Sequence, residues 1–131
     1  MHIRRYTPAD EALVFQMLEE EGDAWSDYHG AENRAKFLRA LNACTAYLLF
    51  EQDTLCGYAR CHADYGFGVY VHDLLVRKSR RGHGYGRLLM EQACRDFPGQ
   101  TVYVLSDVDP YYGKLGYEKI GSIFTVKPPQ A

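Results

Sequence analysis

Residues 67–106 constrain the fold most, because they follow the order strand, loop, helix, strand. Residues 67–77 are rich in Val and Tyr, and the apolar spacing after Arg87 is that of a helix ending near Pro98-Gly99. Residues 101–106 are expected to form the strand that follows this helix. A helix between two strands favours parallel pairing through a right-handed crossover. The segment therefore predicts a sheet with a parallel pair.

The rest of the chain predicts the elements around this unit. Thr7-Pro8 supplies a helix N-cap followed by proline at the first helical position, and Gly22 is a natural stop. Compact apolar runs on either side of Gln52-Asp53 predict a hairpin. The remaining expected elements are strands over 2–6 and 117–126 and helices over about 31–42 and 110–115. The order β-α-α-β-β-β-α-β-α-β predicts an α/β fold with a mixed sheet and helices on both faces.

Length and composition limit the class of protein. A chain of 131 residues with 47% hydrophobic residues can bury a proper core, so residues 1–131 are expected to form one domain. No apolar run approaches the ~20 residues that span a bilayer, so no membrane contact is expected. The N-terminus has no apolar core of signal-peptide length, which favours a cytoplasmic protein. The four cysteines lack CxxC spacing and lie in apolar stretches, so reduced, buried thiols are expected.

The charge distribution is uneven although the net charge is only −2. Residues 1–32 hold eight acids and two arginines, whereas residues 77–87 hold five bases and no acid. A basic patch can bind nucleic acid, but this one is short and coincides with a glycine cluster. The combination indicates a small phosphorylated ligand and argues against a nucleic-acid partner.

The glycine cluster lies between a predicted strand and a predicted helix, at residues 80–87. Glycine allows positive φ and close approach of the backbone, and the free amides of a helix N-terminus bind anions. The dinucleotide fingerprint GxGxxG fails because Arg87 stands at its third glycine, and the P-loop pattern is absent. A flexible turn with exposed arginines is the other interpretation of these residues alone.

Two motifs resolve this choice by resemblance. Arg81-x-x-Gly84-x-Gly86 is similar to the RxxGxG pyrophosphate signature of the GNAT acetyltransferases, and residues 71–76 before it resemble the family's fourth strand. Residues 112–117, Tyr-Gly-Lys-Leu-Gly-Tyr, resemble the family's second recurrent motif, Tyr-x-Lys-Leu-Gly-aromatic. The two motifs occur in the expected order, and residue-level matching is confined to about 69–117. The chain is thus identified as resembling a GNAT N-acetyltransferase.

The resemblance implies a fold, a cofactor and a binding site. The sheet should splay beside the fourth strand, whose backbone would meet the pantetheine arm of acetyl-CoA, while the loop amides would hold the pyrophosphate. Many family members carry an asparagine after the fifth strand; here either Asp107 replaces it or no residue does. The residues expected to bind acetyl-CoA are Leu74, Leu75, Val76, Arg81, Gly82, His83, Gly84, Tyr85, Gly86, Arg87 and Asp107. No metal is expected.

Acetyl transfer to an amine needs a base for the ammonium proton and an acid for the departing thiolate. By the resemblance Tyr112 is the expected acid, with Tyr111 as its rival, because neighbours on a helix point ~100° apart. His72 is the expected base, since histidine titrates near ~6.5. Strand alternation would put His72 and Asp73 on opposite faces unless a bulge intervenes, and a water relay is the remaining alternative.

The acceptor is expected beside the first two helices, at residues 19–29. The acids there would favour a cationic amine, although a solvated acidic helix end is the simpler interpretation; Trp25 and Tyr28 would line the pocket or cover the core. The expected function is transfer of acetyl to a primary amine of a small molecule or peptide. The alternatives are a non-catalytic acyl-CoA-binding domain and, less favoured, a nucleic-acid binder; a homodimer is left open.

Overall fold

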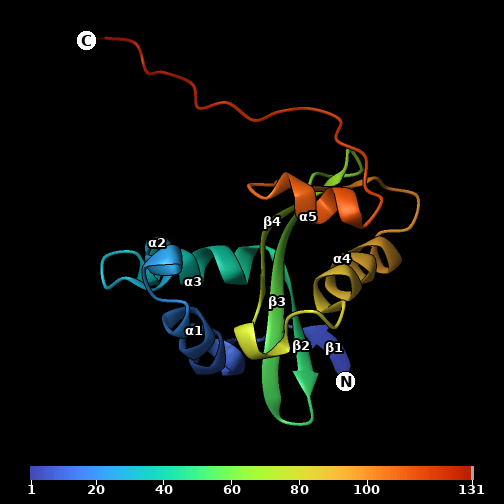
Figure 1. Cartoon of the computed structure of the whole chain (residues 1–131). Helices are drawn as coiled ribbons and strands as arrows, with labels where there is room; N and C mark the ends of the chain where they lie inside the picture. The colour runs from blue at the N-terminus through green and yellow to red at the C-terminus, as the bar shows by residue number, and fades with distance from the viewer. Residues whose placement is uncertain (131) are drawn as a thin grey trace.

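The computed structural model describes residues 1–130, and their strands form one five-stranded sheet in the order β1-β2-β3-β4-β5 (Figure 1). The strands are β1 (His2–Arg5), β2 (Thr45–Glu51), β3 (Thr54–Ala63), β4 (Val69–Val76) and β5 (Val102–Val104). The first three neighbouring pairs are antiparallel, and β4 and β5 are parallel. The mixed sheet and its parallel pair are therefore confirmed.

Helices cover both faces of this sheet (Figure 1). One face carries α1 (Glu11–Glu20), α2 (Ser26–His29) and α3 (Arg34–Ala43), with the 3-10 turns η1 (Pro8–Asp10) and η2 (Gly22–Trp25) between them. The other face carries α4 (Tyr85–Asp96), which follows the turn η3 (Lys78–Arg80). A short helix, α5 (Asp109–Lys114), lies near the end of β5. Residues 22–29, between the first two predicted helices, form η2 and α2.

The apolar residues divide into two buried clusters, one on each face of the sheet. Val14, Leu18 and Phe37 of the first helical layer pack against Leu48 and Tyr58. The second cluster joins α4 to the opposite face; its members include Leu49, Ala59, Val71, Leu89, Met90 and Ala93. These two cores hold the sheet rigidly between its helices, so β4 is fixed from both sides. The cysteines are all free, but Cys94 is exposed, which corrects the expectation that all four are buried.

A β-bulge interrupts β4 in its middle. Arg60 of β3 pairs with Asp73, whereas the next residue, Cys61, pairs with Val71, so His72 is the extra residue on β4. The bulge reverses the alternation of side chains: Val71 packs on the α4 side, and Asp73 then faces the helices on the other side. The bulge considered as an alternative is therefore present.

The parallel strands separate beyond this bulge. β5 pairs with Val69–Val71 only, and the last bond between them runs from the Leu105 amide to the Val71 carbonyl at 3.1 Å. Residues 72–76 continue along β3 with no strand on their other side within the described chain. This is the splay that was expected, and it leaves one edge of β4 open.

One predicted element is wrong. Residues 117–126 were expected as a closing strand, but residues 117–130 form neither helix nor strand and extend away from the body (Figure 1). Their composition suits a strand, yet no neighbouring segment within residues 1–130 pairs with them. The mixed α/β architecture is unaffected, because the other five strands and the helices account for the sheet and its cover.

Candidate active site

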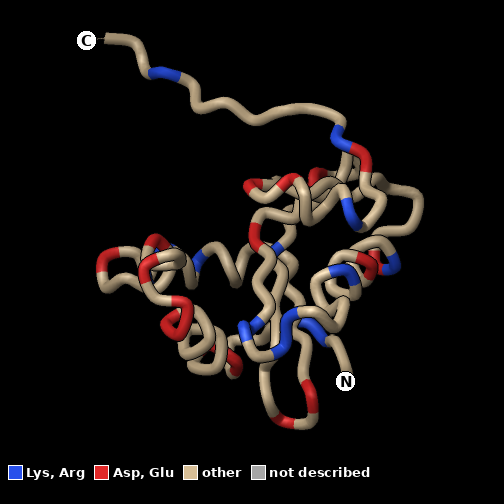
Figure 2. The backbone as a smooth tube through the Cα atoms, viewed as in Figure 1, with Lys and Arg blue, Asp and Glu red and all other residues tan. Residues whose placement is uncertain are grey.

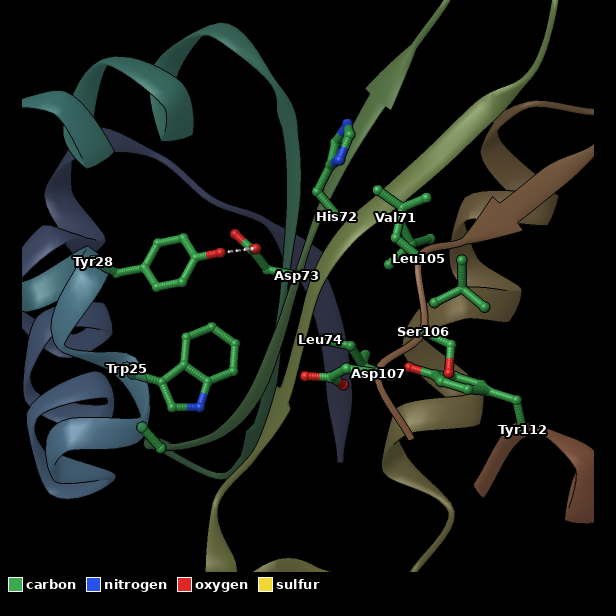
Figure 3. A pocket seen from close by; sticks show the side chains of 12 residues that line it. Trp25, Tyr28, Val71, His72, Asp73, Leu74, Leu105, Ser106, Asp107 and Tyr112 are labelled. Atoms are coloured by element: carbon green, nitrogen blue, oxygen red, sulfur yellow. Dashed lines mark hydrogen bonds between the residues drawn. The ribbon is translucent and has the colours of Figure 1, made fainter. Parts of the chain in front are cut away.

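A cleft of about 410 Å³ lies where β4 and β5 separate. Its walls come from three parts of the chain: residues 71–74 of β4, residues 104–107 at and beyond the end of β5, and Ala24, Trp25 and Tyr28 of the first helical layer. Tyr112 of α5 closes another side (Figure 3). The bulge and the splay together therefore open a polar cavity in the middle of the sheet.

Tyr112 is half-buried at this cleft, and Tyr111 is directed elsewhere. Burial first, and then the neighbouring Tyr111 and the Asp107 carboxylate, raise the pKa of Tyr112 to about 12. The phenol thus keeps its proton at neutral pH and can donate it. A Cβ on Gly86 would collide with the Tyr111 hydroxyl, so Tyr111 lies against the first turn of α4. Of the two tyrosines, Tyr112 lines the cleft.

His72 also lines the cleft, and the bulge leaves its side chain exposed (Figure 3). Partial desolvation against the sheet, followed by the positive charge of Arg60, lowers the pKa of His72 below its usual 6.5, even though much of the residue is exposed. The ring of His62 on β3 lies with its centroid 6.3 Å away and acts in the same direction. The lowered pKa favours the neutral imidazole, which can accept a proton.

Asp73 is held in a different way, as the centre of a hydrogen-bond network. It is 3% exposed and accepts three hydrogen bonds: from the Tyr28 hydroxyl at 2.8 Å, the Tyr58 hydroxyl at 2.8 Å and Arg60 Nε at 2.6 Å. Figure 3 shows its side chain turned toward Tyr28. Every charged oxygen is therefore used, which leaves Asp73 poorly suited to take a proton from a substrate.

The glycine loop leads from β4 into α4. Gly82 and Gly84 have φ of 87° and 77°, values that favour glycine, and Gly84 is the N-cap of α4. A Cβ at Gly82 would meet nothing within 4 Å, so the loop faces open space. Free amides at the start of a helix, facing open space, suit an anion.

A family model supports what this geometry indicates. The model is that of the acetyltransferase (GNAT) family, and it matches residues 11–117, which is most of the chain. The chain belongs to the GNAT family. Both motifs on which the resemblance rested lie within the matched residues.

Curated relatives include a chloroplastic GCN5-related N-acetyltransferase of Arabidopsis thaliana, 26% identical over 129 residues, covering 90% of this chain and 54% of that protein. A histone acetyltransferase of Glycine max is 34% identical over 73 residues, covering 52% of this chain and 32% of that protein. This GNAT chain thus spans about a third to a half of the length of these relatives.

Solved structures with the same fold include an aminoglycoside acetyltransferase from an uncultured soil metagenomic sample. It has a TM-score of 0.74 and 23% identity, and the match covers 98% of both chains. A GNAT family acetyltransferase of Streptococcus pneumoniae has a TM-score of 0.72 and 22% identity, covering 97% of this chain and 98% of that one. The expected GNAT fold is thereby confirmed.

The basic residues around the GNAT loop are already paired with carboxylates. Arg81 donates to the Val76 carbonyl at 3.0 Å and to Glu21 at 2.9 Å. Arg77 pairs with Glu20, and Arg80 pairs with Glu51. The loop's net positive charge is therefore partly neutralised, and its backbone amides become the main attraction for an anion.

The same pairs change the interpretation of the acidic segment (Figure 2). Glu20 and Glu21 face the loop, and Glu19 pairs with Arg34 of α3 at 3.3 Å. These three carboxylates therefore form ion pairs with arginines of the same chain, which weakens the case that they attract a cationic acceptor. Of the expected acceptor-site residues, Trp25 and Tyr28 do line the cleft.

The structure places the other predicted carrier-binding residues unevenly. The Leu74 side chain and Asp107 line the cleft. The Arg77 amide donates a hydrogen bond to the Cys56 carbonyl of β3. Because the backbone groups of an antiparallel strand point alternately to its two edges, those of Leu74 and Val76 point to the open edge. Leu75 is the exception: its side chain is buried in the cluster under α1 and α3, and its backbone pairs with Tyr58, so it has no surface toward the cleft. His83 is exposed on the loop, Arg87 is exposed in the first turn of α4, and the Tyr85 hydroxyl donates to Glu51 at 2.9 Å.

Sequence reasoning missed Tyr58 and Arg60, which fix Asp73. A signal was available, because Arg60 stands inside a largely apolar strand, and a charge in such a place needs a buried partner.

No helix among residues 1–130 is long and apolar enough to cross a bilayer. Within those residues no three or more His, Cys, Asp or Glu side chains form a group that could hold a metal ion. The cytoplasmic location stays a prediction.

Proposed function

We propose that this GNAT protein transfers an acetyl group from acetyl-CoA to a primary amine of a small molecule or peptide. One observation carries the proposal: Tyr112 and His72 line the same cleft. The Tyr112 phenol keeps its proton, and the His72 imidazole can accept one. Tyr111, next to Tyr112, packs on Gly86, so this cleft adjoins the glycine loop.

The residues present suit acetyl-CoA, which supplies the acetyl group as a thioester. The pyrophosphate would accept hydrogen bonds from the amides of residues 82–87, at the positive end of the α4 dipole. The open edge of β4 at Leu74 and the Val76 amide would bind the pantetheine arm, as a strand would. The Val76 carbonyl already accepts from Arg81, so it is not available to the arm. Asp107 lies beside Tyr112, on the same cleft.

The two catalytic side chains would divide the proton transfers. An amine with pKa ~10.4 is neutral in only about one molecule in 2,500 at pH 7, so a base that removes the ammonium proton raises the reactive fraction. His72 takes this proton, the amine nitrogen bonds to the acetyl carbon, the carbon–sulfur bond breaks, and the new amide nitrogen gives up its second proton to the Tyr112 phenolate or to solvent. Tyr112 gives its proton to the departing thiolate, whose conjugate thiol has pKa ~8.5.

The walls of the cleft favour an acceptor with a flat or apolar group near its amine. Trp25 and Tyr28 form one wall with ring centroids 5.1 Å apart, and the carboxylate of Asp73 is already satisfied. Relatives act on different amines, as the names histone acetyltransferase and aminoglycoside acetyltransferase indicate. A turnover screen of acetyl-CoA with small amines and peptide amines would identify the acceptor; binding of acetyl-CoA with no turnover on any amine would support the non-catalytic alternative.

Acetyl-CoA is expected to raise the melting temperature of the wild-type protein, and Gly84→Asp is expected to abolish that shift. A ligand at about 100 times its Kd stabilises a protein by about 2.7 kcal/mol. The nearest atom to a Cβ at Gly84 is Arg87 Nη2 at 3.7 Å, so the side chain fits, and its carboxylate would occupy the anion site from within. Gly84→Asn is the matched control, because Asn tolerates the same backbone conformation without the charge. A shift in Gly84→Asp as large as that of the wild type and of Gly84→Asn would remove the loop from the binding site.

The pH profile tests the base. We expect kcat/KM to rise with pH through an apparent pKa below 6.5, because the protonated His72 cannot accept a proton and its pKa is lowered. His72→Gln should lose this limb and then follow only the ionisation of the amine. His62→Gln is the control: it keeps the limb and moves it slightly upward, because a neighbouring positive charge has been removed. A limb that survives in His72→Gln would assign the base to solvent or to another side chain.

A further inference from the structure

One carboxylate holds both ends of the glycine loop. Glu51 is the last residue of β2, and its two oxygens accept hydrogen bonds from opposite ends of the loop. Arg80 Nε, at the end of η3, donates to Oε1, and the hydroxyl of Tyr85, the first residue of α4, donates to Oε2 at 2.9 Å. Gly82 and Gly84, both with positive φ, lie between these two donors. A single side chain therefore joins the entry of the loop to its exit.

Glu51 is itself fixed to the sheet. The thiol of the fully buried Cys56 on β3 donates to Glu51 Oε1 at 3.3 Å. The Cys56 carbonyl accepts from the Arg77 amide at 2.7 Å, so the same residue also anchors the chain that leads into η3. Hydrogen bonds from Tyr85, then Cys56 and Arg80, lower the pKa of Glu51, so its carboxylate is charged at neutral pH. The β2–β3 hairpin thus provides a fixed support for the loop.

This support has two opposite effects on an anion that binds the loop. Glycine loses more conformational freedom than other residues when it is ordered, so a loop that is already ordered binds its ligand at a lower entropic cost. The negative charge of Glu51, in contrast, repels an anion and occupies Arg80. The side chains of Glu51 and Arg80 are 35% and 37% exposed, so water screens their charges. Ordering of the loop is therefore expected to be the larger effect.

We propose that Glu51 is a positioning residue for the carrier: by joining Arg80 to Tyr85, it holds the glycine loop in the conformation that binds the pyrophosphate of acetyl-CoA. Glu51 is not among the residues that line the cleft of Tyr112 and His72. Its contribution therefore belongs to carrier affinity and not to the proton transfers. The inference rests on the proposed function, because it requires that acetyl-CoA binds at this loop.

The test is the affinity of the full chain for acetyl-CoA, measured by isothermal titration calorimetry. Glu51→Ala should raise the Kd about tenfold, because it removes the acceptor of two hydrogen bonds that hold the loop. Glu51→Gln should recover much of the affinity, since its amide oxygen can accept from Arg80 and its amide nitrogen can donate to the Tyr85 hydroxyl. Asp53→Ala is the matched control: it removes the same charge from the exposed turn of the same hairpin and should keep the wild-type Kd.

Two further measurements separate positioning from a general loss of structure. With acetyl-CoA saturating, kcat and the pH profile of Glu51→Ala should equal those of the wild type, while the KM for acetyl-CoA rises. Tyr85→Phe should also raise the Kd, and the double variant Glu51→Ala/Tyr85→Phe should bind no more weakly than Glu51→Ala, because both changes break the same connection.

Four results would overturn the inference. Tighter binding in both Glu51→Ala and Glu51→Gln would mean that Glu51 acts only as a repelling charge. An unchanged Kd in Glu51→Ala would mean that the loop is ordered without it. Equal weakening in Asp53→Ala would assign the effect to the hairpin's charge. A wild type that binds no acetyl-CoA would refute the proposed function itself, and the positioning role with it, whereas the first three results leave the proposed function intact.

Discussion

Tyr112→Phe is expected to lower kcat by about 10²–10⁴ while the stabilisation by acetyl-CoA stays unchanged, because general acid catalysis contributes factors of this size. The substitution removes one hydroxyl and keeps the ring, which is packed among the half-buried residues around α4. The wild-type phenol is protonated throughout the neutral range, since its pKa is raised to about 12. The lost proton should therefore appear in kcat and leave binding of the carrier intact.

Tyr111→Phe provides the matched control. Both tyrosines lie on α5, with ring centroids 5.0 Å apart, but the Tyr111 hydroxyl lies against Gly86. We expect Tyr111→Phe to change the acetyl-CoA affinity more than kcat. A larger fall of kcat in Tyr111→Phe than in Tyr112→Phe would show that the wrong tyrosine has been assigned as the acid.

Most of the fold could be predicted, because local patterns determine its elements. Apolar runs separated by Gln52-Asp53 place the hairpin, and the order strand–helix–strand implies the parallel pair β4–β5. Residues 117–126 show where this reasoning ends. Their composition favours a strand, but a strand forms only where an edge pairs with it, and within residues 1–130 none does.

The candidate site divides in the same way. The glycine loop and Tyr112 follow from short motifs, whose residues lie close together in the sequence. The bulge at His72 depends on how β4 is aligned with β3, which alternation within β4 alone cannot predict. The pairing of Arg77 with Glu20 joins residues 57 positions apart, and it changes the meaning of both the basic loop and the acidic segment. The charge patterns predicted a phosphate site and left a cationic acceptor as one interpretation of the acidic segment, but neither pattern shows which charges neutralise each other.

The buried network around Asp73 leads to the second large effect: Asp73→Ala is expected to reduce the free energy of unfolding by about 3–5 kcal/mol. The substitution leaves the Arg60 guanidinium, whose side chain is 15% exposed, with a positive charge and no carboxylate, and it leaves the Tyr58 hydroxyl buried without its acceptor. Urea unfolding monitored by circular dichroism measures the loss.

Tyr28→Phe distinguishes the contribution of the hydrogen bonds to Asp73 from that of its ion pair with Arg60. This variant removes one of three donors to Asp73 and leaves the ion pair with Arg60, so we expect a loss of only about 1 kcal/mol. Tyr28→Phe should also raise the KM for the amine, because the Tyr28 side chain joins α2 to β4 at the wall of the cleft. In both variants the folded protein should keep the rise of kcat/KM with pH that is assigned to His72, since Asp73 positions its neighbours and takes no proton from the amine.

Two results would contradict this assignment. Loss of that rise in Asp73→Ala, with the rise intact in His72→Gln, would make Asp73 the base. Equal losses of stability in Asp73→Ala and Tyr28→Phe would mean that the ion pair contributes nothing to the fold.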